Sequence, residues 1–223
     1  MGLSQTSILD EIPMIDRMIP QRLETALFGM GCFLRGEAQF GLTRGIWRTL
    51  VGYAGGNYAS PTYNDAGDQI EVIFVEYDPL TISYGQLLEL FLRWHACSET
   101  EVLPEYASSI FVKNEGERRL AQAAVERYNF SSEDLALTRI MAFKTFRLAE
   151  RWCQKYFLRI SPWFMPELRF FYNDEDVLVR STLAMRLNGI LGLSPSAFLL
   201  PDSIDTYGLS EHAVQVLKRM MTV

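Results

Sequence analysis

The stretch ALFGMGCFLRGEAQFG, residues 26–41, decides how the first half of the chain folds. Its first six residues, 26–31, form an apolar run with the length and composition of a short buried strand. The residues after Cys32 repeat apolar side chains at helical spacing over 33–41, so we expect a strand that turns into a helix at this cysteine. Gly29 and Gly31 lie beside the turn and tolerate the close approaches and unusual dihedrals that it requires.

Strand and helix patterns alternate along the rest of the chain as far as residue 160. The patterns predict further strands at 47–53, 70–77, 108–113 and 139–146, and further helices at 85–94, 115–128 and 148–158. Two polar stretches rich in turn-forming residues, 54–68 and 95–107, predict long loops. Alternating elements with long loops favour an α+β fold, a two-layer α/β plait of the ferredoxin-like type with a mixed sheet.

The two ends of the chain differ in pattern from this region. Residues 1–24 lack firm periodicity and predict an N-terminal arm with at most one short helix. The composition shifts after Pro162, and helical patterns at 174–187 and 209–221 are separated by a Gly-, Pro- and Ser-rich linker. We therefore expect an arm at 1–24, one domain at 25–160 and an added C-terminal helical region at 161–223.

Composition and charge exclude several classes of protein. The 223 residues are 48% apolar and 13% aromatic, which suffices for one sizeable core. A net charge of -6 without a Lys/Arg block argues against nonspecific nucleic-acid binding. The chain has neither a secretory leader pattern nor an apolar run of spanning length, so we expect a cytoplasmic protein with no membrane span. Gly2 also fits the loose pattern for N-myristoylation, an alternative that would anchor the chain only reversibly.

The sequence offers no pattern for a bound metal or nucleotide. His95, Cys97 and the distant His212 lack the four-ligand spacing of a structural zinc site. The glycine motifs that hold phosphates are also absent. The three cysteines are too few and too scattered for a disulfide scaffold, which favours a reducing compartment.

Cys32 itself admits two interpretations. Most unpaired cysteines are small buried apolar residues. At the N-terminus of a helix, however, free N–H groups and the helix dipole favour the thiolate, so a reactive nucleophile is the second interpretation. The two loops supply candidate partners for it. The first contains Tyr63 and is followed closely by Glu71, and the second contains Glu101, Glu105 and Tyr106. Glu71 is either an exposed charge or a buried general acid with a raised pKa, and spacing leaves both open.

Several ordered motifs resemble one known family. They are GCF followed by GE at 31–37, VGYAGG at 51–56, SPTY at 60–63, IEVIFVEYDPLTISYGQLLELF at 70–91, EYASSIF at 105–111 and FRLAERWCQKYFL at 146–158. In this order they are similar to the A-type peptide-methionine sulfoxide reductases. The resemblance spans residues 25 to about 160 and does not extend into the last sixty residues.

The resemblance implies thiol-dependent reduction of methionine (S)-sulfoxide, free or in proteins, to methionine. Cys32 would attack the sulfoxide sulfur and become a sulfenic acid. Glu71 matches the family's proton donor, and Tyr63 and Tyr106 match the tyrosines that hydrogen-bond the sulfoxide oxygen. The resemblance implies no bound cofactor, and an external thiol such as thioredoxin as reductant.

The resemblance also assigns substrate-binding residues and shows where the chain departs from the family. Phe33 matches one wall of the pocket for the methyl group, and Leu34 stands where the family has a tryptophan. Glu101 falls near an aspartate that assists substrate placement. Further departures, which remove supporting contacts, are Arg35, Gln69, Glu105 and Ala107. They leave open an alternative, a catalytically impaired relative that acts as a protein-binding module.

Regeneration of Cys32 is a separate question. Many family members use cysteines near the C-terminus to form a disulfide with the catalytic residue, and this tail contains none. Cys153 and Cys97 are the candidates for a resolving thiol, although each also fits an ordinary packed or loop cysteine. A one-cysteine cycle, with direct reduction by an external thiol, is the other alternative.

Overall fold

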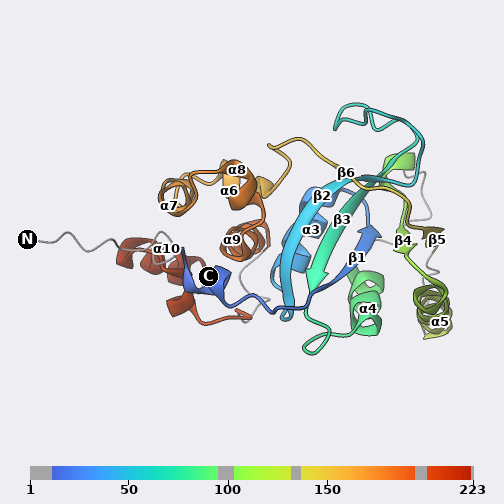
Figure 1. Ribbon diagram of the computed structural model, residues 1–223, viewed down its shortest axis with the longest axis horizontal. Helices are drawn as coiled ribbons and strands as arrows, with labels where there is room; N and C mark the ends of the chain where they lie inside the picture. Colours follow the sequence, from blue (N-terminus) through green and yellow to red (C-terminus); the bar gives the residue numbers. More distant parts are fainter. Residues whose placement is uncertain (1–11, 95–102, 132–136, 194–199, 222–223) are drawn as a thin grey trace, which may run out of the picture.

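A six-stranded sheet lies at the centre of the molecule (Figure 1). The structure, a computed structural model, describes residues 12–94, 103–131, 137–193 and 200–221. The strand order is β5-β4-β1-β3-β2-β6. The strands are β1 (Glu24–Gly29), β2 (Ile46–Ala54), β3 (Ile70–Tyr77), β4 (Ser109–Val112), β5 (Arg139–Ala142) and β6 (Arg147–Leu148). β4 and β5 are parallel and all other neighbours are antiparallel, so the expected α+β fold with a mixed sheet is confirmed.

Three helices belong to the main apolar core against the sheet. They are α3 (Phe33–Gly41), α4 (Tyr84–Trp94) and α5 (Glu115–Ser131). Phe28 of β1 stacks on Phe40 of α3 and on Phe91 of α4, with ring centroids 5.4 and 5.2 Å apart. Before α4, Ser83 and Gln86 bond each other's backbone N–H groups at 2.9 and 3.2 Å, a capping box that starts the helix.

The chain between β5 and β6 covers part of the opposite face of the sheet. The strand predicted at 139–146 ends at Ala142, because the chain then leaves β4 and packs Phe143 and Phe146 on the apolar cluster around Leu27. The ring of Phe146 lies 5.3 Å from that of Phe74. The chain then pairs with β2 as β6, at the other edge of the sheet.

A second apolar core is built from helices at both ends of the chain. These are α2 (Met14–Arg17), α6 (Tyr156–Ile160), α7 (Met165–Phe171), α8 (Glu175–Val179), α9 (Thr182–Gly192) and α10 (Glu211–Met221). In Figure 1 they form a group beside the sheet, with α9 nearest to it. Asp16 of α2 accepts hydrogen bonds from Tyr172, from Ser181 at 2.9 Å and from the backbone of Thr182. The N-terminal arm is therefore tied to the C-terminal helices.

Two predicted helices are wrong in extent. The helix predicted at 148–158 begins only at Tyr156, because Gln154 instead bonds its side-chain amide to both backbone groups of Val51 at 2.7 and 3.0 Å. The helix predicted at 174–187 is two helices, α8 and α9. The break lies at Ser181, whose hydroxyl accepts from the N–H of Ala184 at 3.0 Å and caps α9. Helix α7 was not predicted.

Arg186 joins the second core to α3. Its buried guanidinium donates to the carbonyl oxygens of Gly41 and Ile46, both at 2.7 Å, and pairs with Asp202 at 2.5 Å. Helices α3 and α9 also approach so closely that a Cβ on Gly41 would lie 2.8 Å from the carbonyl oxygen of Met185. Glycine is therefore required at this crossing.

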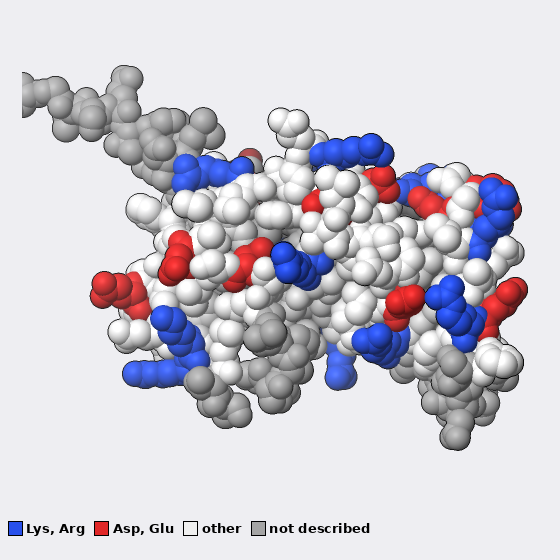
Figure 2. Space-filling view, turned by 90° about the horizontal axis from the view of Figure 1, so that it is seen from below, with Lys and Arg blue, Asp and Glu red and all other residues white. Residues whose placement is uncertain are grey.

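In the part of the chain that the structure describes, every helix is too short or too polar to cross a membrane. The face seen in Figure 2 carries Lys and Arg interspersed with Asp and Glu.

Candidate active site

The site forms where β1 ends and α3 begins. Cys32 is the N-cap residue of α3, and its side chain is exposed. β1 is antiparallel to β3, so the beginning of β3 lies beside the end of β1 and carries Glu71 to the start of α3. The backbone N–H of Phe33 donates to Oε2 of Glu71 at 3.0 Å, which joins the residue after the cysteine directly to the carboxyl group.

Glu71 is a buried acid, as one of the two interpretations predicted. It is 2% exposed, and its pKa is raised to about 7: burial is the main cause, the N–H of Phe33 opposes it, and the charges of Glu105 and Glu150 add to it. At neutral pH a large fraction of Glu71 therefore carries a proton. A carboxyl group in this state can donate that proton to a substrate.

The electrostatics of Cys32 differ from the expectation based on the helix terminus. Although Cys32 is exposed as a residue, the surroundings of its thiol are partly desolvated, which raises the pKa of the thiol; the N–H groups of Leu34 and Arg35 lower it, as predicted, but do not outweigh this effect, and the charge of Glu71 also raises it. The pKa of Cys32 is therefore raised above its ordinary value. Because an ionised Glu71 opposes the thiolate, the thiolate forms more readily when Glu71 is protonated.

Tyr63 and Tyr106 lie within electrostatic reach of both Cys32 and Glu71. Burial raises the pKa of each phenol, and the charges of Cys32 and Glu71 raise both further, so the two side chains remain hydroxyl donors. Tyr106 belongs to the 3-10 helix η1 (Pro104–Tyr106), which packs against β3. A Cβ on Gly29 would lie 2.9 Å from the carbonyl oxygen of Ala107, so the chain after η1 lies directly on the end of β1.

The aromatic wall of the site begins at Phe33. Its ring is fully buried, and its centroid lies 5.7 Å from that of Tyr53 and 6.1 Å from that of Tyr63. Leu34 is also buried, within the main apolar core. The structure therefore brings together Cys32, Glu71 and the two predicted tyrosines, with Phe33 against one of them. Glu101 and Cys97 lie outside the described residues.

Comparison with known proteins identifies the family. The family model for peptide methionine sulfoxide reductase matches residues 24–165. The chain belongs to this family. A peptide methionine sulfoxide reductase of Drosophila melanogaster is 38% identical over 169 residues, which cover 75% of this chain and 68% of that protein. The A5 reductase of Arabidopsis thaliana is also 38% identical, over 75% of this chain and 67% of its own length.

Solved structures of reductases share the fold. Mxr1 from Saccharomyces cerevisiae in reduced form is 21% identical with a TM-score of 0.57, over 64% of this chain and 88% of that one. Methionine sulfoxide reductase A of Corynebacterium diphtheriae is 22% identical with a TM-score of 0.55, over 63% of this chain and 76% of its own. Both support the α+β assignment.

In this member of the reductase family, Glu150 is a site residue that the sequence analysis missed. Its carboxylate accepts from the backbone N–H of Tyr63 at 2.9 Å and from the hydroxyl of Tyr53 at 3.0 Å. Burial opposes its ionisation, but the hydrogen bonds from Tyr63 and Tyr53 lower the pKa of Glu150 below its usual value. Glu150 thus holds the loop that carries Tyr63. The one signal for it was its place in the FRLAERW motif.

Cys153 has the properties of a packed cysteine. It is fully buried, burial raises its pKa to about 12, and its thiol points at Glu150, with 3.9 Å between sulfur and oxygen. A thiol in this state is a weak nucleophile. Within the described ranges, Cys32 and Cys153 are the free cysteines. The same ranges hold no group of three or more His, Cys, Asp or Glu side chains that suits a metal ion.

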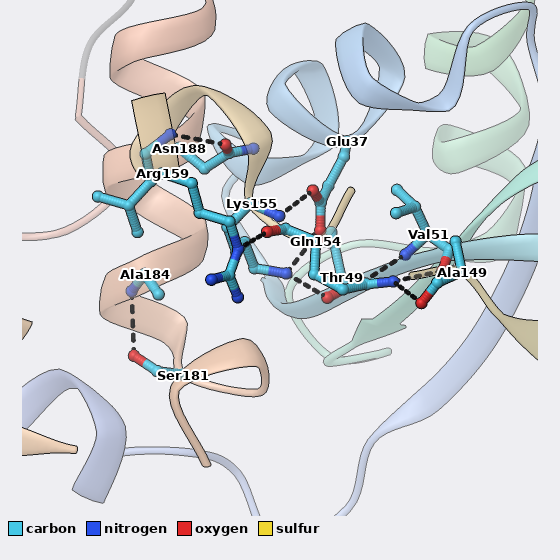
Figure 3. Close-up of polar contacts among 11 residues, drawn as sticks. Glu37, Thr49, Val51, Ala149, Gln154, Lys155, Arg159, Ser181, Ala184 and Asn188 are labelled. Carbon is cyan, nitrogen blue, oxygen red and sulfur yellow. Dashed lines mark hydrogen bonds and ion pairs between the residues drawn. The ribbon is translucent and has the colours of Figure 1, made fainter. Parts of the chain in front are cut away.

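A buried polar network holds Gln154 and Lys155, which follow Glu150 in the chain, against β2 and α3 (Figure 3). Nζ of Lys155 donates to Oε1 of Glu37 at 2.5 Å and to the carbonyl oxygen of Thr49 at 2.7 Å, and both charged side chains are fully buried. Glu37 also accepts hydrogen bonds from the hydroxyl of Thr49 at 3.1 Å and from the backbone N–H of Lys155 at 2.9 Å. Glu37 therefore does not cap α3 but holds it against β2 and the segment before α6.

Proposed function

We propose that this protein is a peptide-methionine (S)-S-oxide reductase that uses Cys32 as its nucleophile. The family assignment supports the reaction class. The observation that carries the proposal for this chain is the buried Glu71, with a pKa of about 7, bonded at 3.0 Å to the amide next to the exposed Cys32. A nucleophile and a proton donor thus meet at one helix terminus.

The proposed reaction transfers oxygen from one sulfur to another. Sγ of Cys32 attacks the sulfoxide sulfur while Glu71 protonates the oxygen, and Tyr63 and Tyr106 hydrogen-bond that oxygen. The protonated oxygen then bonds to Sγ, while both its bond to the substrate sulfur and the sulfur–sulfur bond formed by the attack break. Methionine leaves, reduced by two electrons, and Cys32 remains as a sulfenic acid, oxidised by two. The proton lost by the thiol restores the proton of Glu71.

An external thiol completes the proposed cycle. One thiol condenses with the sulfenic acid of Cys32 to give a mixed disulfide and water, and a second thiol releases Cys32 as thiol together with the external disulfide. The burial of Cys153 and its raised pKa support this one-cysteine cycle. Four statements stay predictions: thioredoxin as the physiological reductant, Cys97 as an alternative resolving thiol, the absence of a bound cofactor, and a cytoplasmic location. Gly2, the residue that fits the myristoylation pattern, lies outside the described residues.

We also infer that the sheet is an extended ferredoxin-like plait. The order β4-β1-β3-β2 with antiparallel neighbours, α3 between β1 and β2, and α4 between β3 and β4 support this topology. β5 and β6 then extend its two edges.

The separate apolar core of the second helical group supports a division near residue 160, with the C-terminal helical region and part of the N-terminal arm on one side.

The proposed function is tested with dabsyl-methionine (S)-sulfoxide and dithiothreitol. We expect turnover by the wild type, none by Cys32→Ser, and a rate lowered about 100-fold in Glu71→Gln, which cannot donate an acidic proton. The (R)-sulfoxide serves as the substrate control and should not react. A wild type no faster than Cys32→Ser would contradict the proposal and leave the protein-binding module in its place.

A further inference from the structure

A row of aromatic rings leads away from the active site. It consists of Tyr63, Trp152, Tyr156 and Phe157, and we call it the aromatic row. Successive ring centroids lie 4.8, 6.5 and 5.4 Å apart, with interplanar angles of 71 to 79°, so each ring meets the next edge to face. Its first ring, Tyr63, also lies against Phe33, the residue next to the nucleophile. The row is therefore continuous with the site.

The aromatic row is both accessible and rigidly supported. Trp152 is 45% exposed, and the other three rings are half-buried. Between Trp152 and Tyr156, the residues 153–155 are buried and held by the network of Glu37 and by the bonds of Gln154 to β2. At its far end, Phe157 packs so closely on α9 that a Cβ on Gly192 would lie 2.5 Å from the ring.

The two arginines that flank the aromatic row in sequence, Arg151 and Arg159, have acidic partners. Arg151 lies 3.9 Å from Asp176, and Arg159 pairs with Glu175 and also donates to the carbonyl oxygen of Gln154. These cations are engaged within the protein, whereas the edges and faces of the rings are what the row presents to a ligand. The chemistry that suits such a surface is apolar or aromatic.

We propose that the aromatic row binds the polypeptide on one side of an oxidised methionine and prefers apolar or aromatic side chains there. This inference rests on the proposed function. A sulfoxide that reaches the exposed Cys32 lies beside Tyr63, and the ring of Trp152 borders Tyr63, so polypeptide that leaves the site on this side crosses the aromatic row. The row extends for at most about 17 Å, the length of about five extended residues. Free methionine sulfoxide is too short to reach beyond its beginning.

The test compares substrates on the complete protein with dithiothreitol. Peptides of about ten residues carry methionine (S)-sulfoxide at the centre. Apolar flanks (Phe and Leu) or polar flanks (Ser and Gly) are placed first on the N-terminal side and then, in a second pair of peptides, on the C-terminal side. We expect kcat/KM to be about tenfold higher for apolar flanks, on one side only. Trp152→Ser should bring this ratio close to 1, while Trp152→Phe, which keeps a ring, should retain it.

The matched control is Trp163→Ser. Trp163 is similarly exposed, at 53%, and lies outside the aromatic row, so its substitution should leave the ratio unchanged. Equal losses on every substrate in Trp152→Ser would overturn the proposal, because Trp152 would then act only by supporting Tyr63. A wild type that shows no dependence on flanking residues would also overturn it, while its turnover would leave the proposed function intact.

A binding measurement separates failure of the row from failure of the chemistry. Fluorescence anisotropy with labelled versions of the same peptides is measured on Cys32→Ser, which cannot turn over. We expect about tenfold tighter binding of the apolar-flanked peptide, and loss of that difference in the double variant with Trp152→Ser. If this binding difference is found but the wild type does not turn over, the proposal for the aromatic row is supported and the proposed function is contradicted. Equal binding of both peptides would overturn the proposal for the aromatic row.

Discussion

The two apolar cores of the molecule are assembled from different parts of the chain. The main core is built mostly from strands and helices that follow one another between residues 24 and 131, with Ala149, Cys153 and Met185 added from later in the chain, and the family motifs fall largely within it. The second core joins Ile15 near the N-terminus to helices from α6 to α10. All the side chains proposed for chemistry lie outside the second core. Helix α3 nevertheless contacts both cores. Its residues Phe33 and Phe40 belong to the main core, and Arg186, which comes from α9 of the second helical group, donates to the carbonyl oxygen of Gly41 at its end. Cys32 stands at the beginning of this helix.

The largest expected effect comes from cutting the link between the two cores. Arg186→Met leaves the carbonyl groups of Gly41 and Ile46 without their donor and leaves Asp202 without its partner. We expect the free energy of unfolding to fall by about 3–5 kcal/mol, measured by urea denaturation.

The matched control for this variant is Arg151→Met. Its ion pair with Asp176 is exposed and 3.9 Å long, so the change should cost less than about 0.5 kcal/mol. Equal effects of the two substitutions would contradict the assigned role of Arg186. Two separate unfolding transitions in the wild type would show that the cores unfold independently.

The next largest effect concerns the pH dependence of stability within the main core. The pKa of Glu71 is raised by burial to about 7, above its value in an unfolded chain, so the folded state favours the protonated form. Its contribution to stability is complete below about pH 4 and is lost as the pH rises through 7. Relative to Glu71→Gln, the wild type should therefore lose about 3 kcal/mol of unfolding free energy between pH 4 and pH 8. A difference that does not change with pH would contradict this assignment.

A smaller effect is expected at Glu150, which lies between the main core and α6. Glu150→Gln removes a negative charge and leaves one oxygen for the two hydrogen bonds from Tyr53 and Tyr63. We expect kcat/KM to fall about tenfold, and the pKa of Glu71 to move down, because the charge of Glu150 raises it. The pH profile of kcat/KM measures this shift. Glu126→Gln, exposed on α5, is the control and should change neither quantity.

The smallest effect is expected at Cys153. Its thiol is buried with a pKa of about 12, so Cys153→Ser should leave the rate with dithiothreitol and the rate with thioredoxin within about twofold of wild type. Both rates are measured under steady-state conditions with the same sulfoxide. A loss confined to the thioredoxin-driven rate would instead identify Cys153 as the resolving thiol.

Local sequence patterns predicted the first half of the chain better than the second half. The bounds of β3 and α3 were predicted to the residue, because clean alternation and helical spacing there agree with the tertiary packing. The helix expected at 148–158 was wrong because the amide of Gln154 bonds to β2, a contact more than a hundred residues away in sequence. Contacts of this kind leave no periodic signal.

The residues of the candidate site that lie in the family's motifs could be predicted from the sequence. Cys32, Glu71, Tyr63 and Tyr106 were assigned through resemblance, and the structure places them together. Glu150 was missed because its role depends on where the chain after β6 meets the Tyr63 loop. The raised pKa of the Cys32 thiol was also missed, since the helix terminus can be predicted from sequence but the burial that outweighs it cannot.

The crossing of α3 and α9 at Gly41 has a consequence for how the protein can vary. A helix is stiff along its axis, and Gly41 comes nine residues after Cys32, or about 13 Å along α3 at 1.5 Å per residue. A methyl group added at Gly41 would press on the backbone of Met185 and displace the whole rod. The residue allowed at Gly41, far from the reacting sulfur, is thus restricted by the position that Cys32 needs at the other end of α3.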